Sequence, residues 1–382
     1  MELMKRTGIL SFAFAIAVMA VVVFAIENRP LLAVSRYDEG QTLLVDDPLA
    51  LSNPPANNED GQPHTNEQGS DVIWIPEIDA RGIIDNDNES VEALRFESGG
   101  IATGHLAVPV PPGTLVQAVA IENHYMSEEL RIVIAGVDAD FFANTVISGN
   151  RDGILSGSYT VGTGGVTLNF VLDDIYECVS IMENGYIYIE LVPPRMLNEK
   201  IIVIDPAHGG SEYGIVANGV NEKDVTLAVA VRLKELLDET DIKVYYTRLF
   251  DNNVDEQRRV RIANSTKADM LIRIECDADN DSLLYGTTTV YNSTFFIPRF
   301  GSIDLANILE REVVLSIIGN AVGLKPATSG DYVIANAAVP AAAIRIGYLT
   351  NAQEAILLQR EDYLEKAAAG IFNAIMKAYE FE

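Results

Sequence analysis

The chain has 382 residues, enough for two or three domains, and 48% of them are hydrophobic while 21% are charged. Most of it should therefore fold around packed cores. The formal net charge of −28 at pH 7 argues against nucleic acid as a partner, because phosphate backbones are bound by basic surfaces.

The first predicted element is an uncharged apolar run at residues 8–26, "GILSFAFAIAVMAVVVFAI". A helix rising about 1.5 Å per residue is just long enough over this run to cross a bilayer. Lys5 and Arg6 precede it, which places the N-terminus in the cytoplasm and the rest outside. Residues 1–26 are predicted to be a cytoplasmic tip and transmembrane anchor. The alternative is a cleaved signal peptide, which would make the protein secreted.

A polar segment and a β-rich region follow the apolar run. Residues 27–71 include "SNPPANNEDGQPHTNEQGS", which cannot bury enough apolar surface to fold and is predicted to be a disordered acidic tether. Residues 72–196 contain strand patterns such as "LRIVIAGV" and "YIYIELVPP", and Asn184-Gly185 is a hairpin turn signal. These patterns predict a small all-β sandwich. Cys178 and Cys276, far apart in sequence, are predicted to be buried free thiols.

Residues 197–382 alternate apolar strands with helical patterns, which predicts an α/β domain with a mixed or parallel sheet flanked by helices. Strands are expected in "KIIVIDPAH", "IKVYYTRL", "ADMLIRIE", "YGTTTVYN" and "PAAAIRIGYLTN". Helices are expected after Asn221, over 256–263, from a Ser302 cap to about Gly319, after an Asn351–Glu354 capping box, and over 363–379. The first of these helices has an apolar stripe of Val225, Val229, Leu233 and Leu236.

Two of these strands carry charges where a core strand should not. In "ADMLIRIECDAD" the side chains of Arg273, Glu275 and Asp277 share one face, because alternate residues of a strand point the same way. The strand "AAAIRIGYLTN" carries only Arg345. A buried charge is costly unless it is paired, so these residues are predicted to pair or to serve a site.

Several segments in order resemble the Amidase_3 type of N-acetylmuramoyl-L-alanine amidase, a family of zinc-dependent bacterial peptidoglycan hydrolases. They are "IVIDPAHGG", "NGVNEKDVTLAVAVRLKELL", "VYYTR", "QRRVRIANSTKADMLIRIECDAD", "VGLKP" and "VPAAAIRIGYLTNAQEAILL". The resemblance covers about residues 199–380. The β-rich region is similar, in pattern and chain position only, to the AMIN type of domain that targets cell-wall enzymes.

The resemblance implies a set of site residues. In the family two histidines and a glutamate bind zinc, and a second glutamate moves the proton. His208 matches the first histidine and Glu222 the zinc-binding glutamate, but Glu275 stands at the second histidine and Arg345 at the catalytic glutamate. Arg273 replaces a family serine. Asp205, Arg259 and Asn264 are expected to be structural, with Asp205 bracing the His208 loop.

These substitutions favour a degenerate site. Arginine stays protonated and cannot act as a general base. A Glu275–Arg345 pair shared with Arg273 would satisfy the charges without zinc. The hypothesis is a membrane-anchored, extracytoplasmic amidase homologue, catalytically impaired, that binds peptidoglycan or a cell-wall protein and needs no cofactor. Two alternatives stay open: an active amidase with zinc on His208, Glu222 and Glu275, and a structural protein–protein module.

Overall fold

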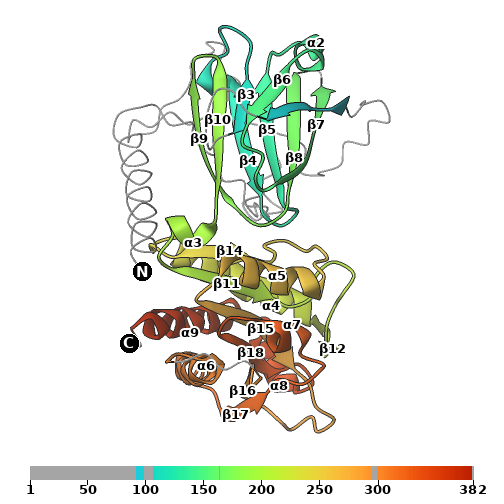
Figure 1. Cartoon of the computed structure of the whole chain (residues 1–382). Coiled ribbons are helices and arrows are strands. Elements are labelled where there is room, and N and C mark those ends of the chain that lie inside the picture. The colour runs from blue at the N-terminus through green and yellow to red at the C-terminus, as the bar shows by residue number, and fades with distance from the viewer. Residues whose placement is uncertain (1–91, 99–105, 163, 295–298, 381–382) are drawn as a thin grey trace, which may run out of the picture.

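The computed structural model describes residues 92–98, 106–162, 164–294 and 299–380. The predicted anchor 1–26, the predicted tether 27–71 and the start of the β-rich region lie outside these ranges. Within the described ranges, no helix combines the length and the apolar character needed to cross a bilayer. Figure 1 shows an all-β body followed by an α/β body.

The all-β body consists of two five-stranded sheets packed on each other, which confirms the predicted small sandwich. In sheet order the first is β1 (Glu92–Ala93), β7 (Ile154–Gly162), β8 (Gly165–Leu172), β5 (Glu129–Ala135) and β4 (Val119–His124). The second is β2 (Arg95–Ser98), β6 (Val146–Gly149), β3 (Leu106–Pro109), β10 (Tyr186–Val192) and β9 (Glu177–Glu183). Alternate residues of both sheets, among them Ile132, Phe170 and Ile189, are buried in one shared core. Two short elements, η1 (Val116–Ala118) and α2 (Ala139–Ala143), connect strands.

The hairpin predicted at Asn184-Gly185 is confirmed. Both turn residues have positive φ, 52° and 79°, as a two-residue hairpin turn of the I′ type requires. Tyr186 therefore pairs with Glu183 across the turn, and β9 and β10 run antiparallel.

The α/β body follows α3 (Pro194–Leu197) and contains a six-stranded mixed sheet, which confirms the predicted fold class. The strand order is β14 (Lys243–Tyr246), β11 (Ile201–Pro206), β15 (Met270–Asp277), β18 (Ala341–Tyr348), β16 (Thr287–Tyr291) and β17 (Ala321–Pro326). The first four strands are parallel, and β16 runs antiparallel to β18. A separate two-stranded sheet is formed by β12 (Val216–Ala217) and β13 (Val220–Asn221).

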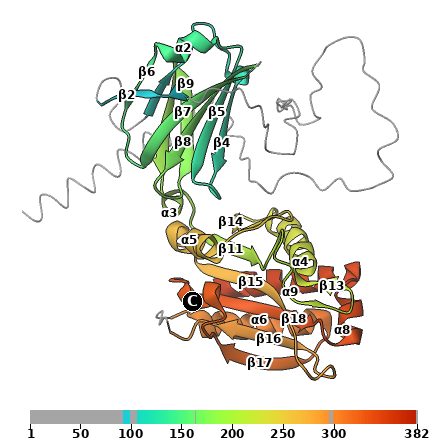
Figure 2. The same cartoon turned by 90° about the vertical axis from the view of Figure 1, so that its right-hand side faces the viewer.

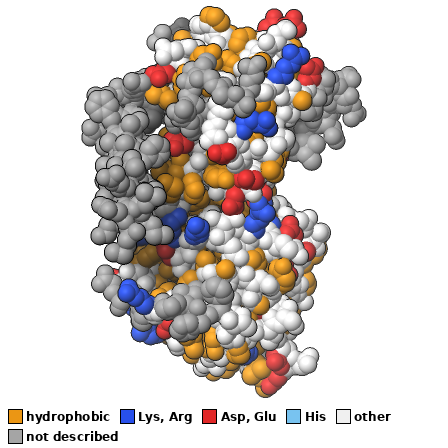
Figure 3. Space-filling view, in the orientation of Figure 1, with side chains coloured by type: hydrophobic (Ala, Val, Ile, Leu, Met, Phe, Trp, Pro, Cys, Tyr) orange, Lys and Arg blue, Asp and Glu red, His pale blue; other side chains and the backbone are white. Residues whose placement is uncertain are grey.

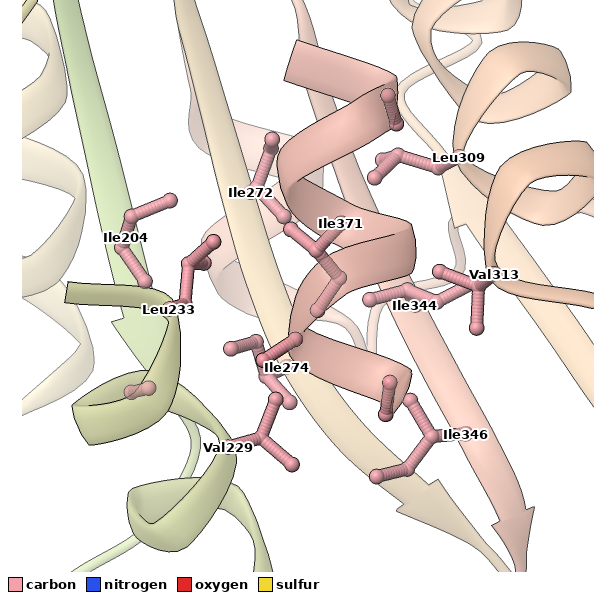
Figure 4. Close-up of a cluster of buried hydrophobic side chains, with 14 of the residues drawn as sticks. Ile204, Val229, Leu233, Ile272, Ile274, Leu309, Val313, Ile344, Ile346 and Ile371 are labelled. Atoms are coloured by element: carbon pink, nitrogen blue, oxygen red, sulfur yellow. The ribbon is translucent and has the colours of Figure 1, made fainter. Parts of the chain in front are cut away.

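Helices cover both faces of the six-stranded sheet (Figures 1 and 2). On one face lie α4 (Glu222–Leu237), α6 (Ser302–Ile317) and α9 (Glu361–Tyr379). On the other lie α5 (Glu256–Thr266) and α7 (Tyr332–Asn336), and α8 (Ala352–Leu357) follows β18. Figure 4 shows Ile272 and Ile274 of β15 packed between Leu233 of α4 and Ile371 of α9. The apolar face of β15 is therefore buried in the core, and its charged face is turned the other way.

Three details of the predicted helices are wrong. The stripe of α4 ends at Leu237, which is buried, while Leu236 is 37% exposed, because a strict four-residue spacing keeps position 237 over the sheet. Gly301 is the N-cap of α6, and the Ser302 hydroxyl instead accepts a hydrogen bond from the Ala341 N–H. Asn351 caps α8 as predicted.

Glu354 does not complete a capping box with Asn351. Its carboxylate accepts hydrogen bonds from the N–H groups of Tyr348 and Gly286, at 2.7 and 3.0 Å. These two N–H groups lie at the end of β18 and just before β16. Because the Glu354 carboxylate bonds them, it is not free to cap the start of α8. Both cysteines are buried free thiols, as predicted.

The two bodies are joined by buried hydrogen bonds at the edge strand β14. The Tyr125 hydroxyl donates to the Tyr246 carbonyl at 2.7 Å and accepts from the Tyr246 N–H at 3.2 Å. Glu177 accepts a hydrogen bond from the Tyr245 hydroxyl at 2.6 Å and pairs with the Lys243 ammonium at 2.7 Å. The all-β body thereby satisfies an exposed strand edge of the α/β sheet.

Candidate functional site

The site lies at the carboxyl ends of the parallel strands β11, β15 and β18, where loops of an open α/β sheet gather. After β11 the chain turns sharply at His208, which has a left-handed φ of 61°. Arg259 of α5 holds this turn by donating hydrogen bonds to the carbonyl oxygens of Pro206 and His208, both at 2.8 Å. Arg259 therefore has the structural role that was predicted, and it acts by holding the backbone of the His208 loop.

His208 and Glu222 contact each other at the start of α4. The distance between His208 Nε2 and Glu222 Oε2 is 3.1 Å, and the Glu222 side chain is almost fully buried. Glu222 also accepts hydrogen bonds from the N–H groups of Ile215 at 2.9 Å and Cys276 at 2.8 Å. Burial alone would raise the pKa of Glu222, but His208 and the two N–H groups outweigh it and hold the pKa below its usual range.

Glu275 directs both carboxylate oxygens at arginines. Oε1 accepts from Arg273 Nε at 2.6 Å, and Oε2 accepts from Arg345 Nε at 3.0 Å. Glu275 of β15 and Arg345 of β18 are direct register partners on neighbouring strands. Arg345 also donates from Nη2 to Asp331 Oδ1 at 2.7 Å, and its Nη1 lies 3.8 Å from Asp277 Oδ1.

The pairs join into one chain of alternating charge, which we call the ion chain. Its members are, in order of contact, Arg259, Asp205, Arg273, Glu275, Arg345 and Asp331. Three positive and three negative groups neutralise one another, so the burial of each is compensated.

The electrostatic effects of the ion chain follow from its burial. Burial raises the pKa of Asp205, but the charges of Arg259 and Arg273 outweigh this and hold the pKa well below its usual range. Burial lowers the pKa of Arg273 and Arg345, yet their carboxylate partners raise both above the usual arginine value. Neither guanidinium can therefore release a proton to act as a base.

These residues do not fit a three-ligand zinc site. The 3.1 Å between His208 Nε2 and Glu222 Oε2 is a hydrogen-bond distance, shorter than the roughly 3.3–3.6 Å between two ligands held about 2.0–2.2 Å from a tetrahedral ion. Glu275, the residue expected as the third metal ligand, has both carboxylate oxygens hydrogen-bonded to guanidinium groups. Across the described ranges, no three His, Cys, Asp or Glu side chains are grouped so that they could hold a metal ion.

Sequence reasoning brought together Arg273, Glu275 and Arg345 but missed Asp331. This residue precedes α7, and its Oδ2 also accepts hydrogen bonds from the Thr328 N–H and hydroxyl, at 2.9 and 2.8 Å. The sequence positions of Asp331 and Arg345 give no sign that they meet. Their contact depends on how the chain folds back between α7 and β18, which only the tertiary structure shows. Asp205 was expected to brace the His208 loop, and it does so through Arg259.

Fold and site together define an α/β domain that places a partly exposed histidine against a buried glutamate at the carboxyl ends of its strands. The chain belongs to the Amidase_3 family of N-acetylmuramoyl-L-alanine amidases, which matches residues 202–377. The all-β body lies outside that match.

Relatives of known sequence match the same half of the chain. The germination-specific N-acetylmuramoyl-L-alanine amidase of Bacillus subtilis (strain 168) is 29% identical over 201 residues, which is 48% of this chain and 81% of the relative. The uncharacterized protein YqiI of the same organism is 32% identical over 181 residues, 47% of this chain and 85% of its own.

Solved structures cover the same region. The catalytic domain of the amidase CwlV from Bacillus (Paenibacillus) polymyxa var. colistinus is 27% identical and matches 48% of this chain and 99% of its own, with a TM-score of 0.44. The CwlD amidase from Clostridioides difficile, solved in complex with the GerS lipoprotein, is 27% identical and matches 48% of this chain and 100% of its own, also with a TM-score of 0.44.

Proposed function

We propose that this chain is an extracytoplasmic member of the amidase family that has lost metal-dependent hydrolysis and acts by binding peptidoglycan or a cell-wall protein. Residues 1–26 would anchor it in the membrane of a bacterium, with the remainder on the cell-wall side. The sandwich would contribute to wall targeting, as its AMIN-like pattern implies.

The observation that carries this proposal is the state of Glu275. At the position of the family's second histidine stands a carboxylate shared by Arg273 and Arg345. At the position of the family's catalytic glutamate stands one of those same arginines. A third metal ligand and a proton-transferring group would both be needed for hydrolysis, and a permanent positive charge beside a dication opposes its binding.

An active amidase is the second candidate, because the side chains of His208 and Glu222 still lie next to each other, as two ligands of one metal would. A metal held by His208, Glu222 and Glu275 would require Glu275 to leave its arginine partners. That would leave Arg273 and Arg345 without one of their carboxylates in a largely buried position, which is strongly unfavourable. A purely structural protein–protein module is a further alternative.

The test combines metal content with hydrolysis. The purified chain is loaded with zinc and desalted, its zinc is measured by elemental analysis, and it is incubated with purified peptidoglycan. A family amidase with both histidines serves as positive control. We expect less than stoichiometric zinc and no release of stem peptides. Stoichiometric zinc together with release that is lost in the His208→Ala variant would establish the active amidase instead.

A further inference from the structure

Exposed apolar side chains lie in the loops at the end of the sheet where the site is found. They are Tyr213, Val216, Leu283, Leu284, Tyr285 and Ile318, and we call them the site rim; Leu283 is 79% and Ile318 is 87% exposed. All six lie in loops or a short strand at the end of the sheet where β11 and β15 finish and β16 and β17 begin. Figure 2 shows β13 and α8 together at this end of the body.

Hydrogen bonds connect the loops that carry the site rim. The Asn218 side chain, two residues after Val216, donates to the Leu349 carbonyl at 2.7 Å. The adjacent Thr350 hydroxyl accepts from the Asp279 N–H at 3.1 Å. The Asn320 side chain, two residues after Ile318, donates to the Tyr285 carbonyl at 3.4 Å. The rim is therefore carried by one set of mutually fixed loops. The Lys223 ammonium lies 4.5 Å from the centre of the Tyr213 ring, and all six rim side chains remain exposed to water.

The charge of these loops is one-sided. Segments 209–221, 249–255, 278–286, 318–322 and 349–357 contain no Lys, Arg or His. They carry the exposed carboxylates of Glu212, Asp279 and Asp281, while the carboxylate of Asp251 is paired with the Lys223 ammonium at 2.6 Å. Figure 3 shows acidic and hydrophobic side chains next to each other at the lower right end of the α/β body. The surface around the site thus combines apolar contacts with negative charge.

We propose that the site rim docks a protein partner that presents apolar side chains together with Lys or Arg. This inference rests on the proposed function and names the chemistry of its partner. A large exposed apolar surface marks an interaction site, and its acidic surroundings select a basic partner by electrostatic complementarity. A second copy of this chain would bring like charges together and is disfavoured. An anionic wall polymer or membrane is disfavoured for the same reason.

The probe is a fluorescently labelled peptide of alternating Leu and Lys, compared with a Leu/Glu peptide and a Ser/Lys peptide of the same length. Binding is measured by fluorescence anisotropy to the full chain in nanodiscs of neutral phosphatidylcholine, with empty nanodiscs subtracted. Two double variants test the rim: Leu283→Ser with Leu284→Ser, and Asp279→Asn with Asp281→Asn. The asparagines can still accept the turn hydrogen bonds that Asp279 and Asp281 accept from the N–H groups of Asp281 and Leu283.

Two matched control variants remove exposed leucines or exposed carboxylates at positions away from the site rim. Leu115→Ser with Leu155→Ser removes exposed leucines from the all-β body, and Glu235→Gln with Glu239→Gln removes exposed charge from the end of α4. We expect the Leu/Lys peptide to bind tightest, and each rim variant to weaken it by about ten-fold or more, since hot-spot truncations commonly exceed 1.4 kcal/mol. The controls should keep wild-type affinity, and circular dichroism should show unchanged melting.

The proposal is overturned if no peptide binds, if the Leu/Glu peptide binds equally well, or if the control variants weaken binding as much as the rim variants. These outcomes leave the zinc and hydrolysis measurements untouched. Conversely, a metal-loaded, active chain that still binds through the rim would overturn the proposed loss of hydrolysis and retain the partner surface.

Discussion

At the scale of single residues, the site depends on how its charges are shared. Arg273 is 6% exposed and bridges Asp205 and Glu275, so it neutralises two carboxylates that would otherwise repel each other. Arg345 lies nearer solvent, at 22% side-chain exposure, and its partner Glu275 keeps a second cation when Arg345 is removed. The two arginines should therefore differ in their contribution to stability.

Replacing Arg273 by methionine should lower the free energy of unfolding by about 3–5 kcal/mol, the cost of leaving buried charges unpaired. Arg345→Met should cost less, about 1–2 kcal/mol, because solvent and Arg273 still compensate Glu275. Urea denaturation with a common m-value measures both. The exposed Arg360, paired with Asp362, is the control, and Arg360→Met should change nothing measurable. Equal losses for Arg273 and Arg345 would contradict the ion chain as described.

Glu222 should contribute to the pH dependence of stability. Its folded pKa is depressed, so the unfolded chain takes up this proton first as the pH falls below the ordinary glutamate value of about 4.3. The stability that Glu222 provides is complete above that value and is lost as the pH falls toward the folded pKa. The Glu222→Gln variant should therefore lose less stability than wild type between about pH 5 and 3.

Denaturation at fixed pH steps compares the slopes of the two proteins. Asp205 has a depressed pKa too and remains in the variant, so the slope should be reduced rather than abolished. The exposed Glu235→Gln variant should keep the wild-type slope. A slope unchanged in Glu222→Gln would show that its folded pKa is not depressed.

At the scale of elements, short-range geometry governs the strand connections. The β9–β10 hairpin needs positive φ at two successive residues, and Gly185 provides the second at no steric cost. An added Cβ at Gly185 would touch nothing within 4 Å, so any penalty must come from the backbone alone.

Gly185→Ala should lower the free energy of unfolding by about 1–2 kcal/mol, the cost of a left-handed conformation for a residue with a Cβ. Gly164 is the matched control, because its Cβ would also meet nothing within 4 Å and its φ is not in the positive region. Gly164→Ala should be nearly neutral. Thermal unfolding of the two variants measures the difference, and equal melting temperatures would contradict the argument.

At the scale of the whole molecule, the two bodies are held together by polar contacts between residues that are far apart in the sequence. Besides the contacts at β14, Glu128 of the all-β body pairs with Arg258 at 2.9 Å and with Arg261 at 2.5 Å, both on α5. These arginines lie on the helix that also holds the His208 loop through Arg259. The all-β body therefore supports the element on which the site is built.

Weakening this interface should uncouple the two bodies. Wild type should unfold in one calorimetric transition, and the Tyr125→Phe, Glu177→Gln double variant should show two, because the hydrogen bonds of the Tyr125 hydroxyl to Tyr246 and the ion pair of Glu177 with Lys243 are lost. Glu129→Gln, which removes a partly exposed pair with Arg131 inside the sandwich, is the control and should keep one transition. Two transitions in wild type, or one in the double variant, would refute the coupling.

Sequence patterns were sufficient for the architecture and for the pairing of Glu275 with Arg273 and Arg345. Alternation placed Ile272 and Ile274 in the core and Arg273 and Glu275 on the other face, because side-chain direction in a strand depends only on parity. The predictions for Leu236, Ser302 and Glu354 were wrong about which of two neighbouring residues is buried or caps a helix, or about which N–H groups a carboxylate bonds. Such choices depend on contacts between elements, which local patterns do not contain.

What the sequence determined by itself is therefore the α/β and all-β division, the hairpin at Asn184-Gly185 and the placing of charged residues Glu275 and Arg345 on two neighbouring strands, since each is a matter of residue identity and local spacing. Only the tertiary structure decided that six charges join from Arg259 to Asp331 and that loops with exposed apolar side chains gather at the same end of the sheet. The physical reason is that ion pairs and surfaces form between neighbours in space, and strand register and the course of the loops decide which residues become neighbours.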